Sequence, residues 1–211
     1  MRYLILTFSI LFIFVSFAGA SNFNYETGYA AISDKASKAL INAMDKVDDR
    51  IYAVGEHGII LYSDDLGANW TQSESVPFTN TLTDIACISK QKCWATGHDA
   101  TILHTSDFGR TWIKQYEDID FDAPLLSVHM FDNGEGIAIG AFALSLRTSD
   151  GGENWAYLFM DDDDFQPHFN YAYGDSQAWR KSSADEAYAV GEIGKYYISD
   201  DKGLNWLVVS T

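Results

Sequence analysis

Basic residues are scarce in this sequence: 14 lysines and arginines stand against 30 aspartates and glutamates, and the formal net charge at pH 7 is −16. So acidic a surface repels phosphate backbones, and we therefore expect no nucleic-acid partner. Prolines number only three, while aromatic residues make up 15% of the chain, which argues against disorder. With 211 residues, the chain is long enough to bury the core of one domain.

Long apolar runs are missing after the first twenty residues. Those twenty, MRYLILTFSILFIFVSFAGA, place one cation, Arg2, before an apolar run and end on small residues. This is the pattern of a secretory signal peptide, and it predicts cleavage after Ala20. We therefore expect an exported chain with no transmembrane segment after cleavage.

Cysteine is present only twice, as Cys87 and Cys93 in the stretch CISKQKC. In an oxidising compartment this pair predicts a disulfide across a tight hairpin, with two free thiols as the alternative. Two thiols without a second pair or a histidine cluster lack the ligands of a metal site. We expect neither a metal nor another cofactor.

What the sequence does contain is a fourfold repeat. The octets SDDLGANW, TSDFGRTW, TSDGGENW and SDDKGLNW all fit the pattern [ST]-x-D-x-G-x-[TN]-W, and their tryptophans are 42, 43 and 51 residues apart. A second marker, of the type AVG, keeps the same phase with Gly55, Gly97, Gly140 and Gly191. The octet positions are Ser63, Asp65, Gly67 and Trp70; Thr105, Asp107, Gly109 and Trp112; Thr148, Asp150, Gly152 and Trp155; and Ser199, Asp201, Gly203 and Trp206.

Each repeat reads as four short alternating strands separated by turns. In the second unit these are LTDIACIS, CWAT, TILHT and WIKQY. Four strands per period of roughly 40 to 50 residues predict the four-stranded antiparallel blade of an all-β β-propeller. The predicted organisation is a signal peptide over 1–20, a lead-in over 21–38 and a propeller over 39–211, with repeats near 39–75, 81–118, 124–160 and 176–211. The one helical candidate, SDKASKALINAM, is better used at its end as a first strand.

The octet itself has a structural interpretation. Asp107 can accept hydrogen bonds from its own turn, Gly109 can take a positive φ, and Trp112 can pack between blades. A catalytic group is needed once, whereas this group occurs four times around a ring. Repeated units define the scaffold, so we expect no catalytic residue here.

The octets match the Asp-box, or BNR, repeat, and their pairing with the glycine marker resembles the photosystem II stability/assembly factor family of exported BNR-repeat propellers. The resemblance runs from about Leu40 to Trp206 and includes PLLSVHMFDNGEGIAIGAFALSLRTSDGGENW, residues 124–155. It implies a non-enzymatic assembly scaffold in the cell envelope, in the periplasm or, in a phototroph, the thylakoid lumen. The implied partner is a protein of the envelope, such as a membrane-protein complex.

Family members commonly have about seven blades, whereas four boxes are present here. The four boxes predict a four-bladed ring, an incomplete arc, or a truncated copy of a longer propeller. An open arc leaves strand edges unpaired, which favours self-association.

Strand polarity assigns the loops to two faces. The octets and the turns between first and second strands share one face, here the Asp-box face, while the turns after the glycine marker and the blade-to-blade segments share the other, the linker face. Binding concentrates on loops that a rigid scaffold carries. The linker face is our candidate interaction face because it gathers acids and aromatics: Glu56, His57, His98, Asp99, Phe121, Phe165, Phe169, Tyr171 and Glu192.

The alternative to an interaction face is a solvated acidic loop. Calcium binding by the acidic run 161–164 is disfavoured because consecutive acids do not reproduce a spaced chelating loop. His57 and His98 hold similar turn positions in adjacent units, and we expect them to be solvated. His104 and His129 lie in predicted strands and are expected to pack.

The rival function is an enzyme, because Asp boxes also occur in sialidases and other glycoside hydrolases. Such an enzyme needs a paired acid and nucleophile near the ring axis, and sialidases add an arginine triad. The four arginines after the signal, Arg50, Arg110, Arg147 and Arg180, are scattered, and no Phe-Arg-Ile-Pro stretch occurs. A neutral-sugar hydrolase or carbohydrate-binding propeller stays as the alternative.

Overall fold

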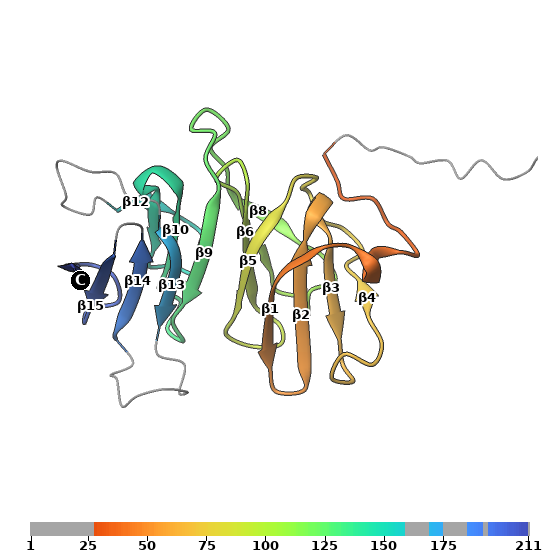
Figure 1. The fold of residues 1–211 in the computed structure, drawn as a ribbon. Helices are drawn as coiled ribbons and strands as arrows, with labels where there is room; N and C mark the ends of the chain where they lie inside the picture. The colour runs from red at the N-terminus through yellow and green to blue at the C-terminus, as the bar shows by residue number, and fades with distance from the viewer. Residues whose placement is uncertain (1–27, 159–168, 175–184, 192–193, 211) are drawn as a thin grey trace, which may run out of the picture.

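A computed structural model describes residues 28–158, 169–174, 185–191 and 194–210 of the chain. In these residues the strands form four separate antiparallel sheets of four strands each. The sheets stand side by side in sequence order, from the orange first sheet to the blue fourth sheet in Figure 1. Each sheet consists of four consecutive strands, which confirms the predicted all-β propeller blade.

The strands follow the repeat closely. Blade 1 contains β1 (Ile41–Val47), β2 (Arg50–Gly55), β3 (Ile60–Ser63) and β4 (Thr71–Gln72). Blade 2 contains β5 (Leu82–Cys87), β6 (Cys93–Gly97), β7 (Ile102–Thr105) and β8 (Ile113–Tyr116). Blade 3 contains β9 (Leu125–Met130), β10 (Gly136–Gly140), β11 (Ser145–Thr148) and β12 (Ala156–Tyr157). Blade 4 contains β13 (Phe169–Gly174), β14 (Ala187–Gly191), β15 (Lys195–Ser199) and β16 (Leu207–Ser210).

Helix is confined to single 3-10 turns among the described residues: η1 (Ala36–Lys38), η2 (Glu56–Gly58) and η3 (Ala141–Ala143). The stretch 33–44 contains η1 and the start of β1, so its end forms a first strand, as the sequence predicts. Across the described ranges, no helix has the length and apolar character needed to cross a membrane.

The fourth blade begins earlier than the repeat spacing predicts. Its first strand, β13, occupies Phe169–Gly174, ahead of the boundary expected at 176. Phe169 and Tyr171 therefore belong to a strand and not to a blade-to-blade segment of the linker face, where the sequence predicts them. The stretch FNYAYG alternates aromatic with smaller residues, which is a strand pattern, and Tyr171 and Tyr173 pair with Val190 and Tyr188 of β14.

The glycine marker reflects a close approach of two strands. Gly55, Gly97 and Gly140 end the second strand of their blades, opposite the start of the first strand, where the register shifts by one residue. A β-carbon on Gly97 would stand 2.7 Å from the carbonyl oxygen of Thr81. The other two positions are still tighter, so a side chain here would force the strands apart. Space, and not backbone conformation, selects glycine.

The core lies between the blades. One buried cluster joins blades 1 and 2 around Tyr52, Leu82 and Trp112. A second joins blades 2 and 3 around Trp94 and Leu125, and a third joins blades 3 and 4 around Ile137 and Tyr197. Apolar burial between neighbouring sheets is what holds a propeller together.

Hydrogen bonds between first strands add direction to this packing. Asn42 of β1 donates to the carbonyl oxygen of Leu82 at 2.7 Å, and Thr83 of β5 donates to that of Leu125 at 2.6 Å. Asn42 and Thr83 both lie at the register shift of their strands. These bonds fix the first strands of blades 1, 2 and 3 relative to one another.

Candidate functional site

The four Asp boxes share one hydrogen-bond network. The Thr105 hydroxyl donates to Asp107 Oδ1 at 2.9 Å and accepts from the Gly109 N–H at 3.1 Å. Asp107 in turn accepts from the Thr111 N–H at 2.9 Å and from its hydroxyl at 2.7 Å. Bonds of the same kind recur in the boxes that begin at Ser63, Thr148 and Ser199.

Charge-assisted hydrogen bonds explain the acidity of the box aspartates. The side chain of Asn69, with its backbone N–H, lowers the pKa of Asp65 to about 2. Each box glycine has a positive φ, between 74° and 88°. The carboxylates of the four repeated aspartates are thus held by hydrogen bonds within their own turns, which accounts for these aspartates without a catalytic role.

The box tryptophans pack against the preceding blade. Trp112 of blade 2 is buried in the cluster that contains Tyr52 of blade 1, and its indole N–H lies 3.2 Å from the hydroxyl of Ser73. Trp155 and Trp206 pack on the clusters of blades 2 and 3 in the same way. Trp70, in the first blade, packs on its own sheet with Leu61 and Ala53. The boxes therefore act as turn and packing elements.

The two cysteines are joined in the structure. Cys87 and Cys93 pair directly across the β5–β6 hairpin, with Cα atoms 4.0 Å apart and a bond between the sulfurs. Cys93 is fully buried beside Tyr52 and Leu103. The disulfide closes the hairpin end on the Asp-box face.

The predicted interaction residues divide among several places. Glu56 and His57 lie in η2, where Glu56 accepts a hydrogen bond from the Leu40 N–H at 3.0 Å. His98 and Asp99 lie in the equivalent turn of blade 2, and Phe121 lies in the loop between β8 and β9. Phe165 and Glu192 lie outside the described residues, as does the acidic run 161–164.

The loop between β8 and β9 carries an exposed apolar group. It is the green loop that projects beyond the sheets in Figure 1. Ile119 is 65% exposed and Phe121 39%, and the ring of Phe121 lies 6.4 Å from the ring of Tyr157, itself 45% exposed. Tyr157 donates to Asp118 Oδ2 at 2.7 Å, which ties β12 to the loop. We call Ile119, Phe121 and Tyr157 the loop patch.

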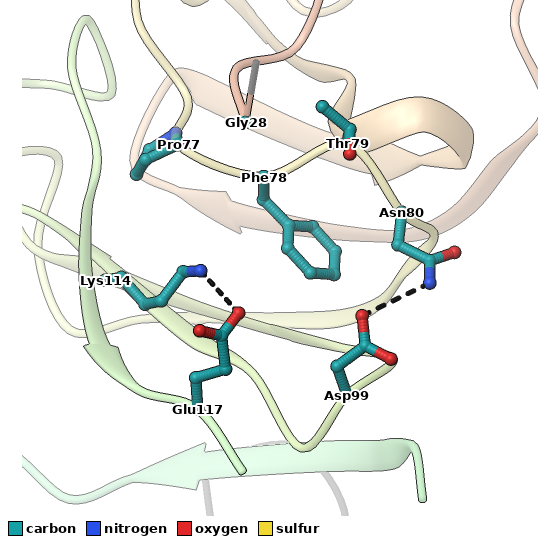
Figure 2. A pocket seen from close by; sticks show the side chains of 8 residues that line it. All are labelled: Gly28, Pro77, Phe78, Thr79, Asn80, Asp99, Lys114 and Glu117. Atoms are coloured by element: carbon teal, nitrogen blue, oxygen red, sulfur yellow. Dashed lines mark hydrogen bonds and ion pairs between the residues drawn. The ribbon is translucent and has the colours of Figure 1, made fainter. Parts of the chain in front are cut away.

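Next to this loop lies a cavity of about 290 Å³, where the segment that links blades 1 and 2 meets blade 2. Figure 2 shows the ring of Phe78 pointing between two polar pairs. On one side Lys114 forms an ion pair with Glu117, and on the other Asn80 Nδ2 donates to Asp99 Oδ2 at 3.3 Å. The remaining lining comes from Gly28, Pro77 and Thr79.

The loop patch and the cavity are linked through the backbone. Asp118 donates its N–H to the carbonyl oxygen of Asp99 at 3.2 Å, one residue beyond the cavity acid Glu117. The same short segment thus provides a cavity wall and the start of the patch. Together they form one continuous region of the linker face.

The histidines are not arranged as metal ligands. In the described part of the chain, no group of three or more histidine, cysteine or acidic residues could hold a metal ion. His104 stacks on Trp94 with ring centroids 4.5 Å apart, and His129 meets Phe131 edge-on at 4.7 Å. Burial lowers the pKa of His129 to about 4, so it packs as a neutral ring.

Two partly buried carboxylates are the strongest candidates for a catalytic acid or base among the described residues. Burial raises the pKa of both Asp45 and Asp84, which lie on the first strands of blades 1 and 2. Asp45 accepts from the Cys87 N–H at 2.7 Å, and Asp84 accepts from the Ser127 hydroxyl at 2.7 Å. Both carboxylates accept hydrogen bonds from the next blade, and this structural role accounts for their burial without a catalytic one.

The arginines are also engaged in structural contacts. Arg50 binds both carboxylate oxygens of Asp64 at 2.6 Å and stacks over the ring of Tyr62 at 4.6 Å. Arg147 pairs with Glu135 at 2.8 Å. Arg180 lies outside the described residues. The described arginines do not converge on one site.

Sequence reasoning missed part of this region. Pro77, Phe78 and Asn80 come from the segment between blades 1 and 2, and Lys114 comes from an outer strand. The stretch VPFTN was a usable signal, because a proline and a phenylalanine are unusual in a polar linker. Tyr157 gave no signal, since it stands in a two-residue strand.

Comparison with known sequences identifies relatives of this arrangement. The sequence profile of the family described as photosynthesis system II assembly factor YCF48 matches residues 72–209. The chloroplastic photosystem II stability/assembly factor HCF136 of Arabidopsis thaliana is 31% identical over 131 residues, which are 59% of this chain and 30% of that protein. The photosystem II assembly lipoprotein Ycf48 of Synechococcus sp. (strain CC9902) is 25% identical over 155 residues, 72% of this chain and 43% of that protein. The chain thus spans less than half the length of these curated relatives.

Solved structures show the same fold. A structure of YCF48 bound to D1 peptide superposes with a TM-score of 0.62 at 20% identity, covering 86% of this chain and 57% of that one. An ancestral GH74 enzyme superposes with a TM-score of 0.64 at 14% identity, covering 80% of this chain and 24% of the enzyme. At these identities the likeness concerns the fold alone.

Proposed function

This chain belongs to the YCF48 family of photosystem II assembly factors, and we propose that it is a non-enzymatic scaffold whose linker face holds a polypeptide segment of a protein partner. The observation that carries the proposal is the loop patch beside the cavity. Exposed aromatic and aliphatic side chains that cluster on a rigid scaffold are typical of protein-binding surfaces.

The chemistry of the patch suits a peptide. Phe121 and Tyr157 present ring faces, while Asp118 fixes the Tyr157 hydroxyl from the loop side. Tyrosine and phenylalanine supply a large contact area at low conformational cost, because few torsions are frozen on binding. A related structure is a complex with D1 peptide, which supports a peptide segment as the bound form of the partner.

Export is part of the proposal. The signal-peptide pattern over 1–20 and the disulfide between Cys87 and Cys93 both fit an oxidising compartment outside the cytoplasm. A relative described as a lipoprotein supports the same location. N-terminal sequencing of the protein recovered from the envelope of its host should begin at Ser21.

Absence of catalysis is also proposed. The GH74 neighbour shares the blade fold. Burial raises the pKa of Asp45 and Asp84, and both carboxylates accept hydrogen bonds from the next blade. A glycosidase needs two carboxyl groups free to reach one sugar bond. We expect no turnover on a panel of neutral and anionic glycosides, and turnover abolished by Asp84→Asn would contradict this.

Peptide binding tests the main proposal. A fluorescently labelled D1 peptide is titrated with the full chain, and binding is followed by anisotropy. We expect saturable binding that the double variant Ile119→Ser, Phe121→Ser weakens at least about tenfold, because each side chain loses apolar contact area worth about 1 kcal/mol or more.

A matched control uses the opposite face. Leu66 and Leu204 are 65% and 52% exposed in Asp boxes of the first and fourth blades. The variant Leu66→Ser, Leu204→Ser should bind like the wild type. No binding by the wild type, or equal loss in both double variants, would contradict the linker-face assignment.

Self-association through unpaired blade edges stays a prediction, and sedimentation of the free chain tests it.

A further inference from the structure

The cavity beside the link between blades 1 and 2 has a composition of its own, distinct from the loop patch. Four chain segments form it: the lead-in at Gly28, the link 77–80, the turn that carries Asp99, and the stretch with Lys114 of β8 and Glu117 just after it. Its volume of about 290 Å³ is at the lower limit of small-molecule sites, which span about 300 to 1,000 Å³. It is therefore suited to one long side chain and not to a whole cofactor.

The floor of the cavity is apolar and fixed. Phe78 is 4% exposed and belongs to the buried cluster between the blades. Its segment is held on both sides, since the Gly58 N–H donates to the Asn80 carbonyl oxygen at 2.7 Å and the Ala30 N–H donates to that of Val76 at 2.9 Å. A site held in this way exists before binding, which reduces the entropic cost of filling it.

The walls of the cavity carry more negative than positive charge. Asp99 and Glu117 supply two carboxylates, and Lys114 supplies one ammonium group. Lys114 pairs with Glu117, so Glu117 is largely compensated. Asp99 has only an amide donor at 3.3 Å, and no cation of the described chain forms an ion pair with it. Asp99 is thus the acceptor in the cavity that still lacks a positive partner.

The residues that follow the cavity in the chain are also negatively charged. Asp118, Asp120 and Asp122 follow directly in the loop that leaves the cavity, and the whole chain carries a net charge of −16. A negative surface raises the local concentration of cations and favours their approach. An anionic side chain would meet repulsion here.

From this arrangement, which builds on the proposed binding of a polypeptide segment, we propose that the cavity receives a cationic side chain, arginine or lysine, of the partner. The charged group lies between Asp99 and Glu117, and the aliphatic stem lies toward Phe78. Hydrogen bonds from a cation to a carboxylate are about twice as strong as neutral ones. Lys114 opposes the incoming charge and tunes the affinity.

Nuclear magnetic resonance of the full chain tests the proposal with small probes. N-acetyl-arginine amide and N-acetyl-lysine amide are added, with N-acetyl-citrulline amide as the neutral match of arginine. We expect saturable shifts of the backbone amides of Asn80, Asp99 and Lys114 with the two cationic probes, and binding of citrulline at least about tenfold weaker. Equal shifts with arginine and citrulline, or shifts confined to other residues, would overturn the proposal.

Two variants should change the affinity in opposite directions. Asp99→Asn removes the carboxylate and should weaken the cationic probes about fivefold or more, while Lys114→Met removes the competing cation and should strengthen them severalfold. Glu153→Gln, an exposed acid in the third Asp box, is the matched control and should change nothing. A retained dispersed amide spectrum shows that each variant is folded, and weaker binding in Lys114→Met would overturn the proposal.

The same protein separates this inference from the proposed function. If the D1 peptide binds and depends on Phe121 while the cationic probes leave the cavity unshifted, the cavity proposal fails and the loop patch stands. If the probes bind through Asp99 while the D1 peptide does not bind, the cavity proposal stands and the assignment of the loop patch fails.

Discussion

The α-carbon of Gly109, in the Asp box of blade 2, lies directly against the ring of Tyr52 in blade 1: a β-carbon at Gly109 would stand 2.5 Å from Tyr52 Cε1. The same relation recurs between Gly203 and Ile137, where the separation would be 2.7 Å. The box glycine is thus required twice, once for its positive φ and once for the contact between blades.

Gly109→Ala tests this double requirement. We expect it to lower the free energy of unfolding by about 2 to 4 kcal/mol, since an alanine at positive φ is strained and its methyl group overpacks the interface. Gly67→Ala is the control, because a β-carbon there would lie 3.5 Å from Trp70 and meets no second blade. It should cost only about 1 kcal/mol of backbone strain. Urea denaturation measures both, and equal losses would refute the contact.

Asp84→Ala tests the brace between blades 2 and 3. Asp84 accepts from the Ser127 hydroxyl at 2.7 Å and from the Val128 N–H at 2.9 Å. Removing the carboxylate takes away the acceptor of both hydrogen bonds at buried positions, at a cost of about 1 to 3 kcal/mol. Asp200→Ala, at an exposed position, should change the unfolding free energy by less than about 0.5 kcal/mol. A loss for Asp84→Ala no greater than that of the control would show that these hydrogen bonds do not stabilise the contact between blades 2 and 3.

Reduction of the disulfide should destabilise the chain. The bond between Cys87 and Cys93 closes a loop with a sequence separation of 6, and loop-closure entropy for so short a loop corresponds to about 2 kcal/mol. Thermal unfolding with and without dithiothreitol measures the loss. The double variant Cys87→Ala, Cys93→Ala should be insensitive to the reductant, and a reductant effect that persists in it would assign the loss elsewhere.

The Asp boxes make stability depend on pH in the acid range. Asn69 lowers the pKa of Asp65 to about 2, against an ordinary value of 3.8. A depressed pKa in the folded state contributes stability above pH 3.8, and this stability is lost as the pH falls through about 2. In Asp65→Asn the fall in unfolding free energy between pH 4 and pH 2 should be shallower than in the wild type. An unchanged slope in urea denaturation would contradict the shift.

Asp84 supplies a control of opposite sign. Burial raises its pKa above 3.8, so its contribution is fully present below that pH and is lost as the pH rises through the folded-state pKa. In Asp84→Asn the carboxyl group is gone, and with it the gain in stability that its protonation gives the folded state at low pH. The fall in unfolding free energy on acidification should therefore be steeper in this variant. A shallower fall would contradict a raised pKa for Asp84.

The repeat was readable from the sequence because its chemistry is local. A hydroxyl, a carboxylate and a glycine within eight residues close one turn, as Thr105, Asp107 and Gly109 do, and the turn fixes where strands begin and end. In blade 2 the strand bounds follow the sequence to within two residues. The family resemblance rests on the same local signals, and the family profile confirms it.

The start of blade 4 was not readable in this way. Trp155 and Trp206 are 51 residues apart, and no residue in this longer step marks where the first strand of blade 4 begins. The acidic run at 161–164 made the aromatic stretch that follows look like a loop. Pairing with β14 decides that Phe169–Gly174 is a strand. Strand pairing is a tertiary property, since it depends on a partner that lies outside the stretch itself.

The sequence by itself determined the blade, its turns and the acidic character of the surface, because each depends on residues close together in the chain. Only the tertiary structure decided that Phe78, Asp99 and Lys114 share one cavity and that Phe121 meets Tyr157. These residues come from different blades and links, and their meeting depends on how neighbouring sheets pack. The scaffold is therefore encoded locally, whereas the candidate binding region arises from the packing of one blade against the next.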